Sequence, residues 1–436
     1  MNTKVNLKKG YKGKIIKVLH VTGLLTFSDM NMLIENSEKI EMYYRSAHEL
    51  EKEGYVKLGK SNGEKYIKLS LYRSHEEEYR RSIGDAYVEY YLKTYDNLHM
   101  FQETTKNRSK LTKEEKEKER DKRTDNNKKL AEATTRLIMF LGGYVRVDKI
   151  PVWNIKENTG ISENNEQLAL NDRRLQLGDN VFYNNLEVKN VREGIENLRP
   201  SRTNGLLVSD GGDFLIYNTQ NRLLQWTAGP ENTYSYYARM LMDQWSSPER
   251  KRKIHTFQMQ KKPMIVLGKP DALVRLCTEK NVQVQIAKGK PLLSVQNVET
   301  MIYPVLSTSV GIAMLHFLTS SQINLRSEKL LQELNPDLKK DKYQKKYRDG
   351  YLEKKGEQIG ICNFILPDIS KLSAFVKHEL TGIPMEREYL AEIYCIKEYE
   401  WYVKAVIEFY RNEFAIKYDV SECIRVYSID KEMLFS

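Results

Sequence analysis

The segment formed by residues 55–69 constrains the fold of the N-terminal region more than any other part of the sequence. Two short runs of alternating apolar residues flank the pair Asn62-Gly63. This dipeptide is typical of a two-residue turn between antiparallel strands, because both central residues of that turn adopt positive φ. The sequence therefore predicts a β-hairpin.

Three helices are expected before this hairpin. Residues 14–20 have helical spacing, residues 26–29 can cap a second apolar run, and Ser37 can cap a third helix that ends at Gly54. Three helices and a hairpin are the layout of a winged helix-turn-helix, in which the third helix reads DNA. The expected DNA contacts are Lys39, Arg45 and His48 on the helix, and Lys57, Lys60 and Lys65 on the hairpin.

Acidic residues leave a second interpretation of this helix open. It also carries Glu38, Glu41, Glu49 and Glu51, so contact with another protein is the alternative to DNA contact. The first seventeen residues contain six lysines and no acid, which is typical of a basic arm that binds phosphate or of a solvated tail.

The overall charge favours a polyanionic partner. Seventy Lys and Arg residues against 59 Asp and Glu residues leave a net charge of +11, so nucleic acid is the first expectation and an anionic membrane surface the second. The longest apolar stretch, residues 305–318, is interrupted by polar residues and is too short to span a membrane. The N-terminus has no secretory signal, and the four cysteines form no Cys-x-x-Cys pair. We therefore expect a cytoplasmic protein with reduced thiols.

Changes in composition along the chain suggest four regions. Residues 1–72 form the expected winged-helix domain, and residues 73–143 form a helical linker whose part at 106–129 has mixed charge and almost no apolar residue. Residues 144–325 alternate between strand-like and helical segments. Residues 326–436 begin with a basic segment and continue as a C-terminal α/β extension. The expected fold class is α+β.

Carboxylates beside strand-like segments are the best candidates for catalysis. Asp213 follows Asp210 after two glycines, and Glu231 lies beyond the next apolar run. Two acids at strand ends can hold Mg²⁺ or Mn²⁺, which activates water and the scissile phosphate. Glu187 and Lys189 share one side of a strand-like run, where the first would bind metal and the second would stabilise charge on the phosphate.

The same residues also have structural interpretations. Asp-Gly-Gly-Asp is typical of a hairpin turn, and Glu187 with Lys189 would equally form a surface pair. Other chemistries are excluded, because the sequence has no Gly-x-x-x-x-Gly-Lys-Ser/Thr loop and no pair of histidines at metal-ligand spacing. A further phosphate-binding stretch is expected at Arg250, Lys251, Arg252 and Lys253.

The order of these features resembles the MOBC-type plasmid relaxases and replication-relaxation-like winged-helix proteins of Gram-positive mobile elements. The resemblance spans about residues 10–320. It is carried by Phe182-Tyr-Asn-Asn-Leu-Glu-Val-Lys189, Ser201-Arg-Thr-Asn-Gly-Leu-Leu207 and Phe214-Leu-Ile-Tyr-Asn-Thr219, with Trp226 and Glu231 beyond them. It implies a winged helix joined by a charged helical linker to a restriction-endonuclease-like domain of mixed α/β structure.

The activity implied by the resemblance is that of a relaxase, a metal-dependent, site- and strand-specific endonuclease of conjugation and plasmid mobilisation. Such a protein recognises double-stranded DNA at a transfer or replication origin and nicks one strand with Mg²⁺ or Mn²⁺, without a catalytic tyrosine. Asp213 and Glu231 would be the metal ligands, with Glu187 and Lys189 as alternates. A coupling ATPase or an accessory protein would be a further partner. One departure is that no Glu-x-Lys follows on the strand after Asp213, where Ile216-Tyr217-Asn218 stands instead.

Two other functions fit the same sequence. The first is a non-catalytic winged-helix regulator of plasmid replication or transcription, in which the second domain serves dimerisation or docking. The second is a membrane-surface adaptor of a transfer apparatus, whose basic clusters bind anionic lipid. The sequence makes no prediction of the recognised DNA sequence or of the oligomeric state.

Overall fold

The computed structural model describes residues 7, 9–35, 38–61, 63–95, 111–147, 175–176, 178–185, 203–220, 226–227, 246–250, 263–278, 292–293, 301–340, 347–354, 356–381, 391–416 and 423–434. Contacts between residues divide the chain into two compact units. The first comprises Met1–Gln167, Val181–Glu193 and Ser307–Ile312. The second comprises Leu168–Asn180, Gly194–Leu306 and Ala313–Ser436.

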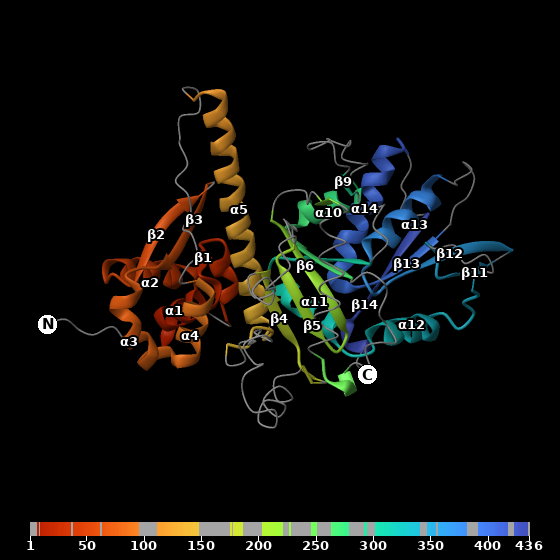
Figure 1. Cartoon of the computed structure of the whole chain (residues 1–436). Helices are drawn as coiled ribbons and strands as arrows, with labels where there is room; N and C mark the ends of the chain where they lie inside the picture. Colours follow the sequence, from red (N-terminus) through yellow and green to blue (C-terminus); the bar gives the residue numbers. More distant parts are fainter. Residues whose placement is uncertain are drawn as a thin grey trace. The chain divides into compact units, whose positions relative to one another are not determined.

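The N-terminal unit begins with a small sheet packed on helices (Figure 1). The three strands are antiparallel and have the order β1-β3-β2. The predicted hairpin is present, and its Gly63 has a φ of 89°. The second expected helix is a short 3-10 turn, η1. The elements are α1 (Gly10–Thr22), β1 (Leu24–Thr26), η1 (Asp29–Leu33), α2 (Ile40–Lys52), β2 (Val56–Ser61) and β3 (Glu64–Leu69).

Three more helices follow in this unit: α3 (Tyr72–Ile83), α4 (Asp85–Tyr95) and α5 (Lys113–Leu141). Thr112 caps α5 by accepting a hydrogen bond from Glu115 N, while the Glu115 carboxylate accepts one from Thr112 N. Residues 113–118 are exposed, as expected of a charged helix. Farther along, Leu137 belongs to the same buried cluster as α1 and α2. The described part of the predicted linker, residues 73–95 and 111–143, is therefore largely helical, and α3, α4 and the end of α5 all contribute to the core, through Tyr79, Val88 and Leu137.

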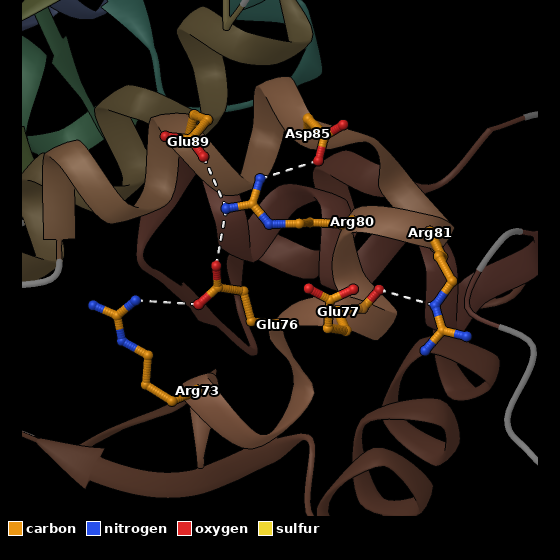
Figure 2. A network of polar contacts seen from close by, with 7 residues as sticks. All are labelled: Arg73, Glu76, Glu77, Arg80, Arg81, Asp85 and Glu89. Atoms are coloured by element: carbon orange, nitrogen blue, oxygen red, sulfur yellow. Dashed lines mark hydrogen bonds and ion pairs between the residues drawn. The ribbon is translucent and has the colours of Figure 1, made fainter.

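An ion-pair network holds α3 against α4, as Figure 2 shows. The guanidinium of Arg80 lies 2.9 Å from Glu76 on its own helix. It also lies 3.0 Å from Asp85 and 2.8 Å from Glu89 on α4. Arg73 pairs with the second oxygen of Glu76 at 3.1 Å. One arginine thus bridges the turn between the two helices.

A neutral histidine lies in the core between α1, α3 and α4. His20 is fully buried, and its Nδ1 lies 2.8 Å from the Ile16 carbonyl oxygen, so Nδ1 carries the hydrogen. The rings of Tyr72, Tyr79 and Tyr91 surround it at 4.8–5.6 Å. Burial lowers the pKa of His20 to about 4, against the smaller effect of the hydrogen bond to Ile16.

A second sheet has the strand order β10-β8-β6-β5-β4. Its strands β4, β5 and β6 are labelled in Figure 1. Its strand β8 runs parallel to β6 and β10, whereas β5 and β6 form an antiparallel hairpin. The strands β5 and β6 confirm two of the strand-like segments expected within residues 144–325, and the strand-like run with Glu187 and Lys189 lies outside the described residues. The elements are β4 (Val181–Asn184), β5 (Gly205–Ser209), β6 (Gly212–Gln220), β8 (Met264–Gly268), α10 (Pro270–Thr278), β10 (Ile302–Leu306) and α11 (Ser309–Thr319).

A third sheet lies in the C-terminal part of the chain and has the order β11-β12-β13-β14. The strands β12, β13 and β14 are parallel, and β11 is antiparallel to β12. The elements are α12 (Ile323–Leu334), β11 (Gly350–Lys354), β12 (Glu357–Phe364), α13 (Ile369–Thr381), β13 (Ala391–Ile396), η6 (Lys397–Tyr399), α14 (Glu400–Glu413), β14 (Ile424–Ile429) and η8 (Lys431–Leu434). A short pair, β7 (Trp226–Thr227) and β9 (Leu292–Leu293), is separate.

The architecture is a mixture of helices and sheets, consistent with the expected α+β class. All four cysteines are free and buried, as predicted. Within the described ranges, no helix combines the length and the apolar character needed to cross a membrane.

Candidate nucleic-acid interface

Helix α2 presents three of the predicted DNA contacts to solvent. Its buried face includes Tyr43 and Leu50, which belong to the core of the N-terminal unit. Because the helix repeats every 3.6 residues, the opposite side stays outside. Lys39, at the start of the helix, Arg45 and His48 are exposed there.

Lysines of α1 pair with Glu49 of α2 and with two acids that flank this helix, Glu38 and Glu53, whereas Glu41 and Glu51 stay exposed. Lys12 lies 3.1 Å from Glu49 and 2.9 Å from Glu53. Lys14 lies 3.1 Å from Glu38. The ammonium of Lys12, and after it the guanidinium of Arg45, lower the pKa of Glu49. These pairs bind α1 to α2 and reduce the negative charge that left a protein-contact interpretation open.

The lysines of the basic arm, residues 1–17, do not all have the same role. Lys12 and Lys14 are used inside the unit, and Lys17 lies 4.9 Å from the centre of the Tyr87 ring. Lys4 and Lys8 lie outside the described residues. The arm is therefore not, as a whole, a free phosphate-binding tail.

Arg45 has donors left for a partner. Its Nε lies 3.0 Å from Glu49 Oε1, yet its side chain is 74% exposed. Exposed pairs of this kind contribute little to stability, so a phosphate or a base can replace the carboxylate at small cost.

The hairpin concentrates positive charge, with four lysines against one acid, Glu64. The register sets Lys57 opposite Lys68 and Lys60 opposite Lys65. Like charges directly opposite each other destabilise a strand pair. Burial, and after it the charge of Lys57, lower the pKa of Lys68. Within the part of the chain that the structure describes, neither Lys57 nor Lys60 forms an ion pair, and both are exposed.

An aromatic residue joins the hairpin to α2. Phe27 stacks on Tyr44 of α2, with ring centres 5.2 Å apart and planes at 24°. The His48 ring lies 6.2 Å from Phe27, and Lys65 Nζ lies 6.0 Å from the same ring. The structure thus brings together His48 and Lys65, two predicted contacts from different elements. Phe27 and Tyr44 were not among the predicted site residues.

The predicted catalytic carboxylate lies elsewhere, in the second unit. Asp213 belongs to β6 and is 3% exposed, while Asp210 lies in the turn before it. The turn interpretation is therefore correct for Asp210. It also explains Gly211, where a Cβ would come within 2.6 Å of the Ser320 carbonyl oxygen.

Asp213 pairs with Arg250, which was predicted to contact DNA. Arg250 Nη2 lies 2.6 Å from Asp213 Oδ1, and Arg250 is 1% exposed. The expectation of a DNA contact does not fit this placement, because the guanidinium is in the interior. Other predicted site residues lie outside the described ranges: Glu187, Lys189, Glu231, Lys251, Arg252 and Lys253.

The surroundings of Asp213 do not fit the expected Mg²⁺ or Mn²⁺. One of its carboxylate oxygens already accepts from a buried guanidinium. The described residues contain no group of three or more His, Cys, Asp or Glu side chains that would hold a metal ion. The proposed partner ligand Glu231 is not among them.

Comparison with known proteins adds no relative. Neither a protein-family model, nor a curated protein, nor a solved structure matches the chain. The function is therefore argued from the residues described above, and what the resemblance to relaxases implies is a proposal.

Proposed function

We propose that the N-terminal unit is a winged-helix DNA-binding module, with α2 as its recognition helix and β2–β3 as its wing. The order of its elements and its three-stranded antiparallel sheet support this proposal. In this arrangement Lys39, Arg45 and His48 face the bases or the adjoining phosphates. Lys57, Lys60 and Lys65 contact the phosphate backbone.

The observation that carries the proposal is the excess of positive charge on the hairpin. Lysines face lysines across the strands, whereas Glu38 and Glu49 are paired with lysines of α1. A phosphate backbone would supply the missing negative charge and release its own counterions. Of the acids that the sequence placed on this helix, Glu38 and Glu49 are already paired, and Glu41 and Glu51 are exposed.

The test is the salt dependence of DNA binding. We would replace Lys57, Lys60 and Lys65 together by glutamine and measure binding of labelled duplexes to the full chain by fluorescence anisotropy. Each lost phosphate contact lowers the slope of log K against log salt by about 0.9, so a decrease of about 2–3 is expected.

The matched control carries the same change of charge on exposed helices elsewhere. Lys329 and Lys404, which are 79% and 63% exposed, and Lys377 would be replaced by glutamine. This variant should keep the wild-type slope. An unchanged slope in the hairpin variant would refute the wing assignment, and binding to anionic vesicles but not to DNA would favour the membrane-surface adaptor.

The geometry favours a DNA-binding regulator of replication or transcription over a relaxase. A relaxase needs metal ligands, and Asp213 is committed to Arg250. Nicking at a transfer origin stays a prediction from the sequence. It is tested with supercoiled plasmid carrying the chain's own origin, in Mn²⁺ or in EDTA: metal-dependent open circles would restore the relaxase, and binding without open circles supports the regulator.

A further inference from the structure

A buried ion pair links two segments of the second unit that are 37 residues apart. Arg250 Nη2 and Asp213 Oδ1 are 2.6 Å apart, and the exposed fractions of the two side chains are 2% and 0%. Buried charges are tolerated only when they are paired and hydrogen-bonded, so the surroundings of each partner show what the pair does.

The guanidinium is held in one orientation by the chain itself. Its Nη1 donates to Ser246 Oγ at 2.7 Å, and its Nη2 also lies 3.4 Å from the Ser209 carbonyl oxygen. The backbone N–H of Arg250 donates to Ser247 Oγ at 3.2 Å. Serines on both sides of the pair thus position Arg250, which occupies one side of the Asp213 carboxylate.

The same segment is fixed to the rest of the unit next to the pair. Ser246 forms a parallel bridge with Leu175, and the N–H of Ser247 donates to the Leu175 carbonyl oxygen at 2.9 Å. Ser209 ends β5, and Asp213 follows the turn into β6. The pair therefore connects the end of the β5–β6 hairpin to residues 246–250.

We infer that Arg250 is the resident cation of Asp213, and that this carboxylate positions the fold instead of binding a divalent metal. A metal ion would have to displace the guanidinium and leave its charge buried and unpaired, which is strongly unfavourable. Magnesium also keeps several of its waters, and a carboxylate with no exposed surface leaves no room for them.

This inference goes beyond the proposed DNA binding and is independent of it. It concerns which acids of the chain can take part in any metal-dependent reaction. If such a reaction exists, acids other than Asp213 bind its metal ion. Asp213→Asn would then affect the reaction only by destabilising the fold.

The first experiment measures metal binding by the full chain. Mn²⁺ would be titrated into wild type and Asp213→Asn, and free Mn²⁺ followed by electron paramagnetic resonance. The number of bound ions and their affinity should agree within twofold between the two proteins. The control is Asp210→Asn, the neighbouring turn residue. A Mn²⁺ site present in wild type and in the control but lost in Asp213→Asn would overturn the inference.

The second experiment needs no variant. Fe²⁺ with ascorbate and peroxide cuts the backbone beside a bound metal ion, so the wild-type chain reports its own metal sites. No cleavage above the EDTA background is expected within residues 205–220. Metal-dependent cleavage there would refute the inference even if Asp213→Asn failed to fold.

The third experiment tests the ion pair between Asp213 and Arg250. Asp213→Asn and Arg250→Met should each lower the melting temperature of the chain, and the double variant should lose less than the sum of the two losses. Additive losses would show that the two side chains do not act as a pair. None of these readouts depends on DNA, so their outcome is separate from that of the salt titration.

Discussion

Acidification is expected to destabilise the N-terminal unit through His20. The side chain is fully buried with Nδ1–H donating to Ile16, and burial lowers its pKa from 6.5 to about 4. In the unfolded chain the imidazole regains its ordinary pKa and binds a proton more readily, so protons favour unfolding. The stability that neutral His20 provides is complete above about pH 6.5 and is lost as the pH falls toward 4.

The size of the effect follows from these two values. At pH 5 the linkage relation gives a loss of about 2 kcal/mol, and below pH 4 the loss approaches about 3 kcal/mol. A loss of about 2 kcal/mol corresponds to a roughly 30-fold change in the opening equilibrium. At pH 7.5 the same relation gives almost no loss.

Hydrogen exchange of the α1 amides measures this opening in the full chain. Wild type and His20→Asn would be compared at pH 7.5 and at pH 5, because asparagine keeps a donor for the Ile16 carbonyl oxygen and has no titration. Intrinsic amide exchange rates change with pH in the same way for both proteins, so a comparison of the two proteins at the same pH removes this effect. The gap in opening free energy between the proteins should shift by about 2 kcal/mol in favour of the variant at pH 5. The same gap at both pH values would refute the reasoning.

Two further predictions concern single backbone positions. Gly211→Ala should destabilise the second unit by about 1–3 kcal/mol, since its Cβ would lie 2.6 Å from the Ser320 carbonyl oxygen and 2.7 Å from that of Leu318. Urea denaturation followed by tryptophan fluorescence measures this loss. A urea midpoint equal to that of wild type would show that the backbone at residue 211 does not lie this close to the Ser320 carbonyl oxygen. Thr112→Val should remove the capping box with Glu115 and cost about 1 kcal/mol. The readout is faster hydrogen exchange in the first turn of α5 only, and exchange that rose along the whole helix would argue against a local cap.

Local chemistry explains which parts of the fold could be predicted. The hairpin at Asn62-Gly63 depends only on the conformation of two residues, and the structure confirms it. A two-residue turn also fixes the register of the strands, so the pairing of Lys57 with Lys68 could have been derived from the sequence. Short apolar runs bounded by Asn, Gly and Asp likewise marked β5 and β6.

The missed features depend on contacts between distant residues. Lys12 and Glu53 are 41 positions apart, and no local pattern links them. Asp213 and Arg250 are a similar case. The residues next to Asp213 in the sequence suggested a metal ligand and those next to Arg250 suggested a phosphate contact, so their pairing with each other was missed. For α5, the charged first half dominates the composition, while the apolar residues that pack on the core come only near its end, as Leu137 does.

The buried thiols make the chain convenient for site-directed labelling. Burial raises the pKa of Cys277 and of Cys395 to about 12, and all four cysteines are buried. Thiolate is the form that reacts with maleimides, so the native chain should remain unlabelled. A cysteine introduced at an exposed position, such as Lys60 on the hairpin, would carry a dye or a spin label without background and report directly on contact with a bound duplex.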